Sequence, residues 1–345
     1  MGEQEGAIRT KLPRDYVSRG DRDTVKQRGA HYISIAGVCR MKKFLTFAVC
    51  HKHDTHTSPT LQAMITVKQL SFGYTHRRNI FDSLSLELPQ GSIVGLLGRN
   101  GEGKTTLLKL LYGQLLRHQG ELSVLGADPK HRAVSFLQQV YLLPEEFQVP
   151  PISIRSFFDI SAPFYPRYDE TIAKELIDTF GLQWEMNLKK ISQGQKKKAL
   201  IAFALSLRVP LLLLDEPTNG LDIPSKGEFR RAVARYTTQE QTIIISTHQV
   251  RDLEQLIDRV LIMERGSIFC NATVADITER LAFKVLTPEL ADKALYSEPS
   301  ALGSIGVLPA VSEDEETNFS MELFFNAVVA EREKILSALG QKHEA

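Results

Sequence analysis

Short apolar runs, each followed by a polar loop, dominate the middle of the chain. Residues 92–97 (SIVGLL), 211–214 (LLLL) and 242–247 (TIIIST) are mostly apolar, and a helical pattern starts near residue 106. Runs of this length with helical segments between them are typical of buried parallel strands joined by crossover helices. Residues 65–67 (ITV) open the series as a first strand. The pattern predicts an α/β fold with a mostly parallel central sheet.

The loop after residues 92–97 has the sequence pattern of a phosphate-binding loop. It fits the pattern G-x-x-x-x-G-K-[ST] and leads directly into the expected helix: Gly98, Arg99, Asn100, Gly101, Glu102, Gly103, Lys104, Thr105 and Thr106. The glycines let backbone N–H groups surround the phosphates, Lys104 can reach the β- and γ-phosphates, and the Thr105 hydroxyl can ligate Mg²⁺. The alternative is a glycine turn that binds nothing. The strand, loop and helix stand in the order that phosphate binding needs, which favours a nucleoside triphosphate site.

The run 211–214 ends in two carboxylates, Asp215 and Glu216. In a parallel sheet the carboxyl ends of the strands face the ligand. Asp215 can hold Mg²⁺, and Glu216 can polarise the attacking water because its neighbour is committed to the metal. The alternative is that both are ordinary solvated residues after a core strand. The phosphate loop favours the first interpretation and predicts nucleotide hydrolysis.

Several further segments resemble the ABC family of ATPases, over about residues 64–280. Residues 191–195 (ISQGQ) resemble the LSGGQ signature, with Gln193 where the family usually has glycine, and residues 217–222 (PTNGLD) resemble the D-loop. His248 follows residues 242–247 as the switch histidine does. Tyr74 corresponds to the aromatic residue that stacks on adenine. The combination and its spacing are specific to this family, although each short piece alone is a weak signal.

The resemblance implies a P-loop ATPase of ABC type, with an antiparallel β subdomain and a helical subdomain beside the central sheet. It implies ATP and Mg²⁺ as ligands, with Glu216, His248 and Lys104 as the catalytic residues. A single phosphate loop leaves one side of the γ-phosphate facing water, which is poor for stabilising transition-state charge. In this family a second subunit covers that side. The ATP held by the other subunit is therefore expected to be contacted by Ser192, Gly194, Gln195 and Asp222. The two subunits are expected to form a homodimer or a pair with a similar ATPase subunit.

Glu145 stands where the family usually has a glutamine, in the segment 140–145 (VYLLPE). A carboxylate can still ligate Mg²⁺ or its water, but it adds negative charge beside the phosphates. Gln138 and Gln139 come too early for this role and are expected within the preceding strand. Lys196, Lys197 and Lys198 are interpreted as a solvated helix face rather than a binding patch.

The expected role is that of the ATP-binding subunit of an ABC transporter, of the type used for export, on a separate transmembrane permease subunit. The expected location is the cytoplasmic face of the cell membrane. The longest apolar stretch, residues 199–207, is too short to span a bilayer. The alternatives are a soluble ABC-type ATPase acting on ribosomes or DNA, and a nucleotide-sensing regulator. The net charge of +1 gives no global preference for nucleic acid.

Composition changes the picture mainly at the two ends of the chain. Residues 1–63 are expected to be a poorly ordered N-terminal extension, with a short signal-like run at residues 41–50 and the natural start at Met64. Residues 64–282 are expected to form the ATPase domain. Residues 283–345 are expected to be a small accessory segment with a Pro- and Ser-containing stretch and one helix over residues 321–336. The three cysteines, Cys39, Cys50 and Cys270, show no pairing or metal spacing.

Overall fold

The computed structural model describes residues 63–75, 78–301, 303–310 and 319–341. The extension expected before Met64, its signal-like run, Cys39 and Cys50 lie outside the described residues. Met64 itself is buried and directly precedes the first strand. The suggested start at Met64 and the division of the chain at residues 63 and 282 stay predictions.

Twelve strands are distributed over three sheets of the described residues. The strands are β1 (Ile65–Phe72), β2 (Phe81–Leu88), β3 (Ile93–Leu97), β4 (Gln119–Val124), β5 (Val140–Leu143), β6 (Leu211–Asp215), β7 (Thr242–Thr247), β8 (Arg259–Glu264), β9 (Ser267–Thr273), β10 (Leu281–Leu286), β11 (Tyr296–Ser300) and β12 (Gly303–Pro309). The helices are α2 (Lys104–Leu111), α3 (Val134–Leu137), α4 (Ile154–Ser161), α5 (Glu170–Thr179), α6 (Gln193–Ser206), α7 (Ile223–Tyr236), α8 (Val274–Arg280), α9 (Pro288–Ala291), α10 (Met321–Ala330) and α11 (Arg332–Ala338). Short 3₁₀ turns are η2 (Pro129–His131), η3 (Ala162–Phe164) and η4 (Val250–Asp252).

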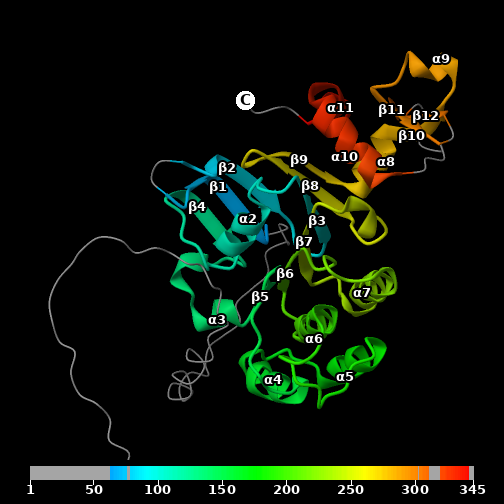
Figure 1. The fold of residues 1–345 in the computed structure, drawn as a ribbon. Helices are drawn as coiled ribbons and strands as arrows, with labels where there is room; N and C mark the ends of the chain where they lie inside the picture. The colour runs from blue at the N-terminus through cyan, green and yellow to red at the C-terminus, as the bar shows by residue number, and fades with distance from the viewer. Residues whose placement is uncertain (1–62, 76–77, 302, 311–318, 342–345) are drawn as a thin grey trace, which may run out of the picture.

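The central sheet has the strand order β5-β6-β7-β3-β8-β9 (Figure 1). All neighbouring pairs are parallel except β8 and β9, which form an antiparallel edge. β7 lies between β6 and β3, so the carboxyl ends of these three strands are adjacent. The loops that follow β3, β6 and β7 therefore meet at one edge of the sheet, where ligands bind in open α/β sheets. The mostly parallel sheet expected from the apolar runs is confirmed.

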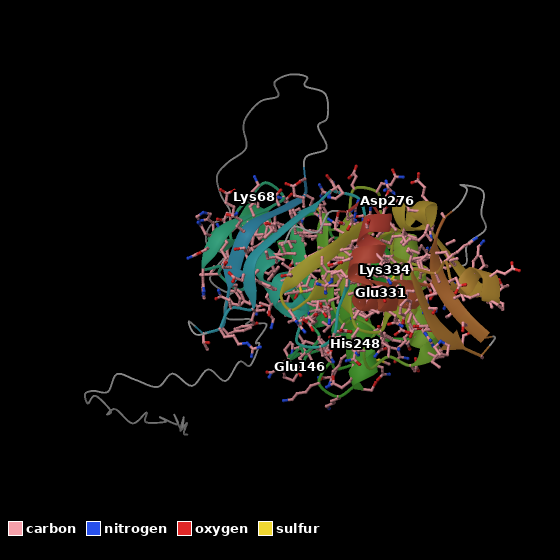
Figure 2. The ribbon with its side chains drawn as sticks, turned by 90° about the horizontal axis from the view of Figure 1, so that it is seen from above. Lys68, Glu146, His248, Asp276, Glu331 and Lys334 are labelled. Carbon is pink, nitrogen blue, oxygen red and sulfur yellow. The ribbon has the colours of Figure 1, made fainter. Side chains whose placement is uncertain are left out.

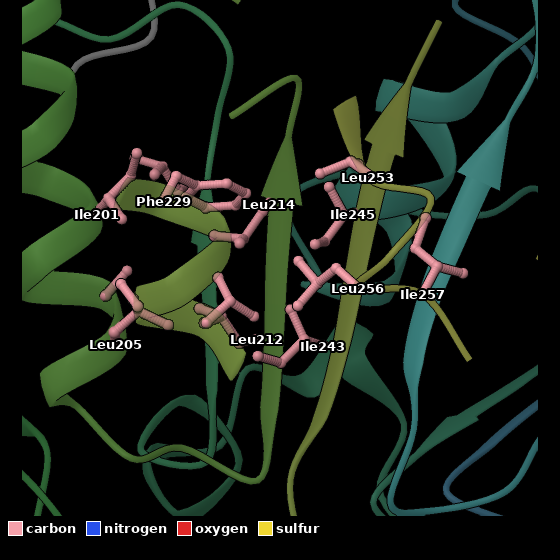
Figure 3. Close-up of a cluster of buried hydrophobic side chains, with 14 of the residues drawn as sticks. Ile201, Leu205, Leu212, Leu214, Phe229, Ile243, Ile245, Leu253, Leu256 and Ile257 are labelled. Atoms are coloured by element: carbon pink, nitrogen blue, oxygen red, sulfur yellow. The ribbon is translucent and has the colours of Figure 1, made fainter. Parts of the chain in front are cut away.

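Helices cover both faces of this sheet. Successive side chains on a strand point to opposite faces, and on β6 Leu212 and Leu214 pack with Ile201 of α6 and Phe229 of α7 (Figure 3). The intervening residues Leu211 and Leu213 belong to the cluster that contains the apolar side chains of α2. α2 thus covers one face and α6 with α7 the other. Burial on both faces explains why the parallel strands are apolar throughout rather than alternating.

Two further regions surround the central sheet as the ABC resemblance implied. The antiparallel sheet β2-β1-β4 forms the expected β subdomain. α4, η3 and α5 form the helical region between β5 and α6 (Figure 1). One local expectation here was wrong, because Gln138 ends α3 and Gln139 precedes β5, so neither lies within the strand.

The C-terminal region is more structured than the sequence indicated. β10, β12 and β11 form an antiparallel sheet in that order, and β10 spans the expected boundary at residue 282. Pro299 lies in β11, which pairs only with β12 and is an edge strand, where a missing N–H is tolerated. The Pro- and Ser-containing stretch therefore contributes a strand rather than an irregular loop.

The prediction of a single helix over residues 321–336 is wrong, because the helical backbone is interrupted at Glu331 (φ −127°, ψ 50°). α10 ends before this residue and α11 begins after it, with an ion pair of 3.0 Å between Lys334 and Glu331 at the junction (Figure 2). Arg332 at the start of α11 lies over the Phe269 ring, 4.1 Å from its centroid, and pairs with Glu264. These contacts with β8 and β9 fix the direction of α11 and favour the break over a continuous helix.

Across the described ranges, no helix combines the length and apolarity needed to cross a membrane.

Candidate nucleotide-binding and hydrolysis site

The phosphate loop closes around the ammonium group of Lys104. Nζ of Lys104 donates to the carbonyl oxygens of Gly98 (2.8 Å) and Arg99 (3.0 Å), and the side chain is almost fully buried. Burial lowers the pKa of Lys104, and the nearby carboxylates of Glu216 and Asp215 oppose that shift. The ammonium therefore lies inside the loop, where the β- and γ-phosphates of a nucleotide bind in this motif.

Gly103 shows why the loop needs glycine where it meets α2. Its φ of +109° is in a region that few other residues adopt, and a Cβ at this position would lie 2.7 Å from the Phe81 ring. Gly98 is also enclosed, since a Cβ there would lie 2.6 Å from the carbonyl oxygen of Met263. The close approach of β2 and β8 to the loop thus fixes its backbone.

The remaining loop residues divide between the exposed tip and contacts to the protein. Arg99, Asn100 and Gly101 are exposed. The Glu102 carboxylate accepts a hydrogen bond from the backbone N–H of Arg265, which braces the loop on the turn between β8 and β9. Thr105 is half-buried at the start of α2.

Glu216 lies at the meeting point of the three strand ends. Its Oε1 is 2.8 Å from Nδ1 of His248 and 4.0 Å from Nζ of Lys104, and its side chain is 6% exposed. Asp215, the preceding residue, accepts a hydrogen bond from Oγ of Ser246 (2.5 Å). The structure therefore brings Lys104, Glu216 and His248 together from the ends of β3, β6 and β7.

This arrangement has the chemistry of a hydrolytic site. A carboxylate held between an ammonium and an imidazole can accept a proton from water at a defined position. The Thr105 hydroxyl and the Asp215 carboxylate are oxygen donors, which fit Mg²⁺. Within the described ranges, no three His, Cys, Asp or Glu side chains gather in a metal-binding group. Mg²⁺ sites in nucleotide enzymes commonly use one or two carboxylates together with the substrate's phosphates.

Tyr74 lies beside the phosphate loop after β1. Its hydroxyl is 3.3 Å from Oγ1 of Thr106 on α2, its ring packs edge-on against Phe72, and the side chain is 53% exposed. The exposed ring is the chemical feature that a stacked base needs.

Glu145 follows β5 and faces the turn after β6. Its Oε1 accepts a hydrogen bond of 2.7 Å from Nδ2 of Asn219. Sequence reasoning assigned no role to Asn219 or to Ser246. Asn219 lies within the D-loop-like segment 217–222, and Ser246 lies two residues before His248. This closeness to assigned residues is the signal that could have found them.

Lys197 is a residue that the sequence interpretation misplaced. The expected solvated lysine face is wrong at this position, because Lys197 is buried and its Nζ donates to the carbonyl oxygens of Glu216 (2.9 Å) and Asn219 (2.8 Å). Helical spacing does not single out Lys197, since every residue from Ala199 to Ser206 is buried and its lysine neighbours have the same spacing to buried residues.

The signature-like and D-loop-like residues stand at helix starts. Ser192 caps α6 in a capping box with Gln195, and Gly194 lies in the first turn of that helix. Asp222 caps α7 by accepting from the backbone N–H of Ser225 (2.9 Å), and hydrogen bonding to Ser225 lowers its pKa. These residues thus stand at the starts of the two helices that cover the sheet face opposite to α2.

Comparisons with known proteins show which family the chain is similar to. A family model described as ABC transporter matches residues 81–219. The bacitracin transport ATP-binding protein BcrA of Bacillus licheniformis is 32% identical over 215 residues, which cover 60% of this chain and 69% of that protein. The ABC transporter ATP-binding protein YtrB of Bacillus subtilis is 29% identical over 217 residues, covering 63% of this chain and 73% of that protein.

A solved structure described as "Structure of ATP binding subunit of ABC transporter" superimposes with a TM-score of 0.56 and 26% identity, over 62% of this chain and 91% of that chain. The sequence relatives, the fold and the phosphate loop thus point to the same family. The chain belongs to the ATP-binding proteins of ABC transporters, the subunits that hydrolyse ATP to power transport.

Proposed function

We propose that this ABC ATPase hydrolyses Mg-ATP at a composite site between two head-to-tail subunits and drives a separate transmembrane permease subunit. The observation that carries the proposal is the convergence of Lys104, Glu216 and His248 at one sheet edge. Closure of the subunits on ATP, followed by hydrolysis and reopening, converts the chemical step into movement of the partner.

Each residue of the first subunit has a distinct role in the proposal. Residues 98–106 cradle the phosphates, with Lys104 on the β- and γ-phosphates, and Tyr74 stacks on adenine. Thr105 and Asp215 hold Mg²⁺, which when bound neutralises the phosphate charge that develops during the reaction. Glu216 takes the proton of the attacking water, and His248 fixes the Glu216 carboxylate and contacts the γ-phosphate.

The second subunit completes the site. Ser192, Gly194 and Gln195 at the start of α6 offer a helix N-terminus to the γ-phosphate of the opposite ATP. Asp222 contributes from the start of α7. On the first subunit, Glu145 at the end of β5, held by Asn219, joins Thr105 and Asp215 as a ligand of Mg²⁺ or its water. Excluding water from both sides of the γ-phosphate strengthens each of these charged contacts.

The helical region offers a surface for the membrane partner. A cavity of about 510 Å³ lies between α4, η3 and the segments on either side of α5, with aromatic walls and charged rim residues: Arg155, Phe158, Asp159, Ala162, Pro163, Tyr165, Pro166, Tyr168, Glu170 and Trp184. An apolar floor with a polar rim is typical of a protein docking site. Docking there places the ATPase peripherally on the cytoplasmic face of the membrane. The near-zero net charge gives no support for a specific nucleic acid partner.

Fractionation tests the docking surface. Co-expression with its transmembrane permease subunit is expected to move the ATPase to the membrane fraction. Asp159→Lys, at the exposed rim of the cavity, is expected to reduce that recovery, whereas the matched change Asp178→Lys, exposed on α5 away from the cavity lining, leaves it unchanged. Recovery wholly on ribosomes or nucleic acid, with or without the membrane protein, would contradict the proposal.

A further inference from the structure

One lysine side chain donates hydrogen bonds to the first and the last carbonyl group of the four-residue turn after β6. Residues 216–219 form this turn, with the N–H of Asn219 donating to the carbonyl of Glu216 (3.2 Å). The ammonium of Lys197 donates to the carbonyl of Glu216 (2.9 Å) and to that of Asn219 (2.8 Å). Lys197 lies on α6, 19 residues before Glu216 in the chain, and its side chain bridges the two ends of the turn.

Glu216 occupies a backbone conformation that needs such support. Its φ of +45° lies in the left-handed region, which few residues other than glycine adopt. Its N–H is held by the carbonyl and hydroxyl oxygens of Ser246 on β7, both at 3.1 Å. Its carbonyl is held by Lys197. The two contacts fix the peptide groups on either side of the Glu216 α-carbon, and so set the direction of the carboxylate toward His248.

We propose that Lys197 is a positioning residue for ATP hydrolysis, which holds the backbone of Glu216 so that its carboxylate points at the attacking water. The proposal rests on the proposed role of Glu216 as the base. Lys197 touches neither nucleotide nor water in this account, and acts through the turn alone.

The same side chain links the turn to the signature-like start of α6. Lys197 lies five residues after Ser192 on one helix, about 7.5 Å along its axis. A shift of α6 when the opposite ATP is bound therefore moves the support of Glu216 with it. Asn219 extends the link to Glu145 through its side-chain amide. Lys197 thereby couples closure of one site to the alignment of the base in the other.

Burying the charged ammonium of Lys197 costs free energy of desolvation, which argues against a role in packing alone. Burial lowers the pKa of Lys197, and the charges of Glu145, Glu216 and Asp215 oppose that shift. Apolar side chains already surround α6 on its buried face, and a methionine would fill the same volume without desolvating a charge. Among the described residues, the Lys197 side chain donates hydrogen bonds to these two carbonyl groups and to no other group.

The test compares Lys197→Met with Lys198→Met in the full chain. Lys198 is the adjacent residue on α6, and its Nζ pairs with Glu228 at 2.9 Å, away from the turn. Lys197→Met is expected to lower kcat about 10- to 100-fold at saturating Mg-ATP, with the KM for ATP and nucleotide affinity changed less than about threefold. Lys198→Met is expected to keep kcat within about twofold. Lys197→Arg, which keeps the charge and the donors, is expected to recover part of the lost rate.

A double-variant cycle separates the positioning role from a structural one. In a Glu216→Gln background, Lys197→Met is expected to cause no further loss of the residual rate, because it acts through Glu216. An equal fold-loss in both backgrounds, an unchanged kcat in Lys197→Met, or loss of the folded state in both the Met and Arg variants would overturn the proposal. If Glu216→Gln itself turns over at the wild-type rate, the proposed function fails instead.

Discussion

Nδ1 of His248 and Oε1 of Glu216 lie 2.8 Å apart, although 32 residues separate them in the chain. They meet because β6 and β7 are parallel neighbours, with Asp215 paired to Ser246 at their carboxyl ends. The imidazole holds the carboxylate on one side, and the Lys104 ammonium faces it at 4.0 Å on the other. The proposed base is thus oriented by the side chains of His248 and Lys104.

His248→Ala is expected to lower ATP turnover about 100-fold, since a general base that loses its orienting partner works far less well. Nucleotide affinity is expected to change little, because the phosphate loop is untouched. Steady-state hydrolysis and fluorescent-nucleotide titration measure the two quantities. His131→Ala, on the exposed turn η2, is the matched control. Equal rates in the two variants would remove His248 from the mechanism.

Two glycines of the phosphate loop separate backbone strain from steric conflict. Gly101 (φ +88°) and Gly103 (φ +109°) both occupy the region that disfavours other residues, but only a Cβ at Gly103 meets a neighbour. Gly101→Ala is expected to lower the free energy of unfolding by about 1–2 kcal/mol from strain alone. Gly103→Ala is expected to cost more and to weaken ATP binding as well, because its Cβ lies 2.7 Å from the Phe81 ring.

Urea unfolding and nucleotide titration of both variants check this comparison. Equal losses of stability, with ATP binding intact in Gly103→Ala, would show that the contact with Phe81 relaxes without moving the loop.

Asp128 is expected to stabilise the fold in a pH-dependent way. Both oxygens of its carboxylate accept from Arg117 at 2.9 Å, and this hydrogen bonding holds the pKa of Asp128 well below its usual range. A carboxyl whose folded pKa is lowered stabilises the native state above its unfolded pKa of about 3.9. That contribution is lost as the pH falls from there toward the lower folded value.

Asp128→Asn is therefore expected to reduce the free energy of unfolding by about 1–2 kcal/mol at pH 7. The difference from wild type should shrink as the pH falls below about 4, since the wild-type carboxyl becomes protonated in the unfolded chain. Urea unfolding of both proteins between roughly pH 3 and pH 7, where they are expected to stay folded, measures this difference in the free energy of unfolding. A difference that is constant with pH would show that the loss does not come from the charge of Asp128, since asparagine can still cap η2.

The strands that carry the site were predictable because local and global preferences agree there. β3, β6 and β7 are continuous apolar runs followed by residues with distinctive chemistry, so pattern and motif gave the same answer. The antiparallel and helical subdomains came from family resemblance, not from periodicity.

The structural features that the sequence did not predict depend on contacts between segments that are far apart in the chain. The break at Glu331 follows from the packing of Arg332 on Phe269 and Glu264, which lie more than 60 residues earlier. The sheet of β10, β11 and β12 includes an edge strand with a proline, which a sequence pattern treats as a loop. Lys197 is buried because two backbone carbonyls of a later turn accept its donors, and a sequence of three lysines gives no sign of them.

The measurement that tests the account most directly is sedimentation of the Glu216→Gln protein with Mg-ATP. Removal of the base is expected to reduce turnover to a small residual rate but leave ATP binding through Lys104 and the loop intact, so the subunits stay closed as a dimer. Adding Ser192→Arg is expected to return the protein to a monomer that still binds ATP, because in the proposed composite site Ser192 contacts only the nucleotide of the other subunit. A Glu216→Gln protein that stays monomeric with ATP bound, or that hydrolyses ATP at the wild-type rate, would contradict the composite site.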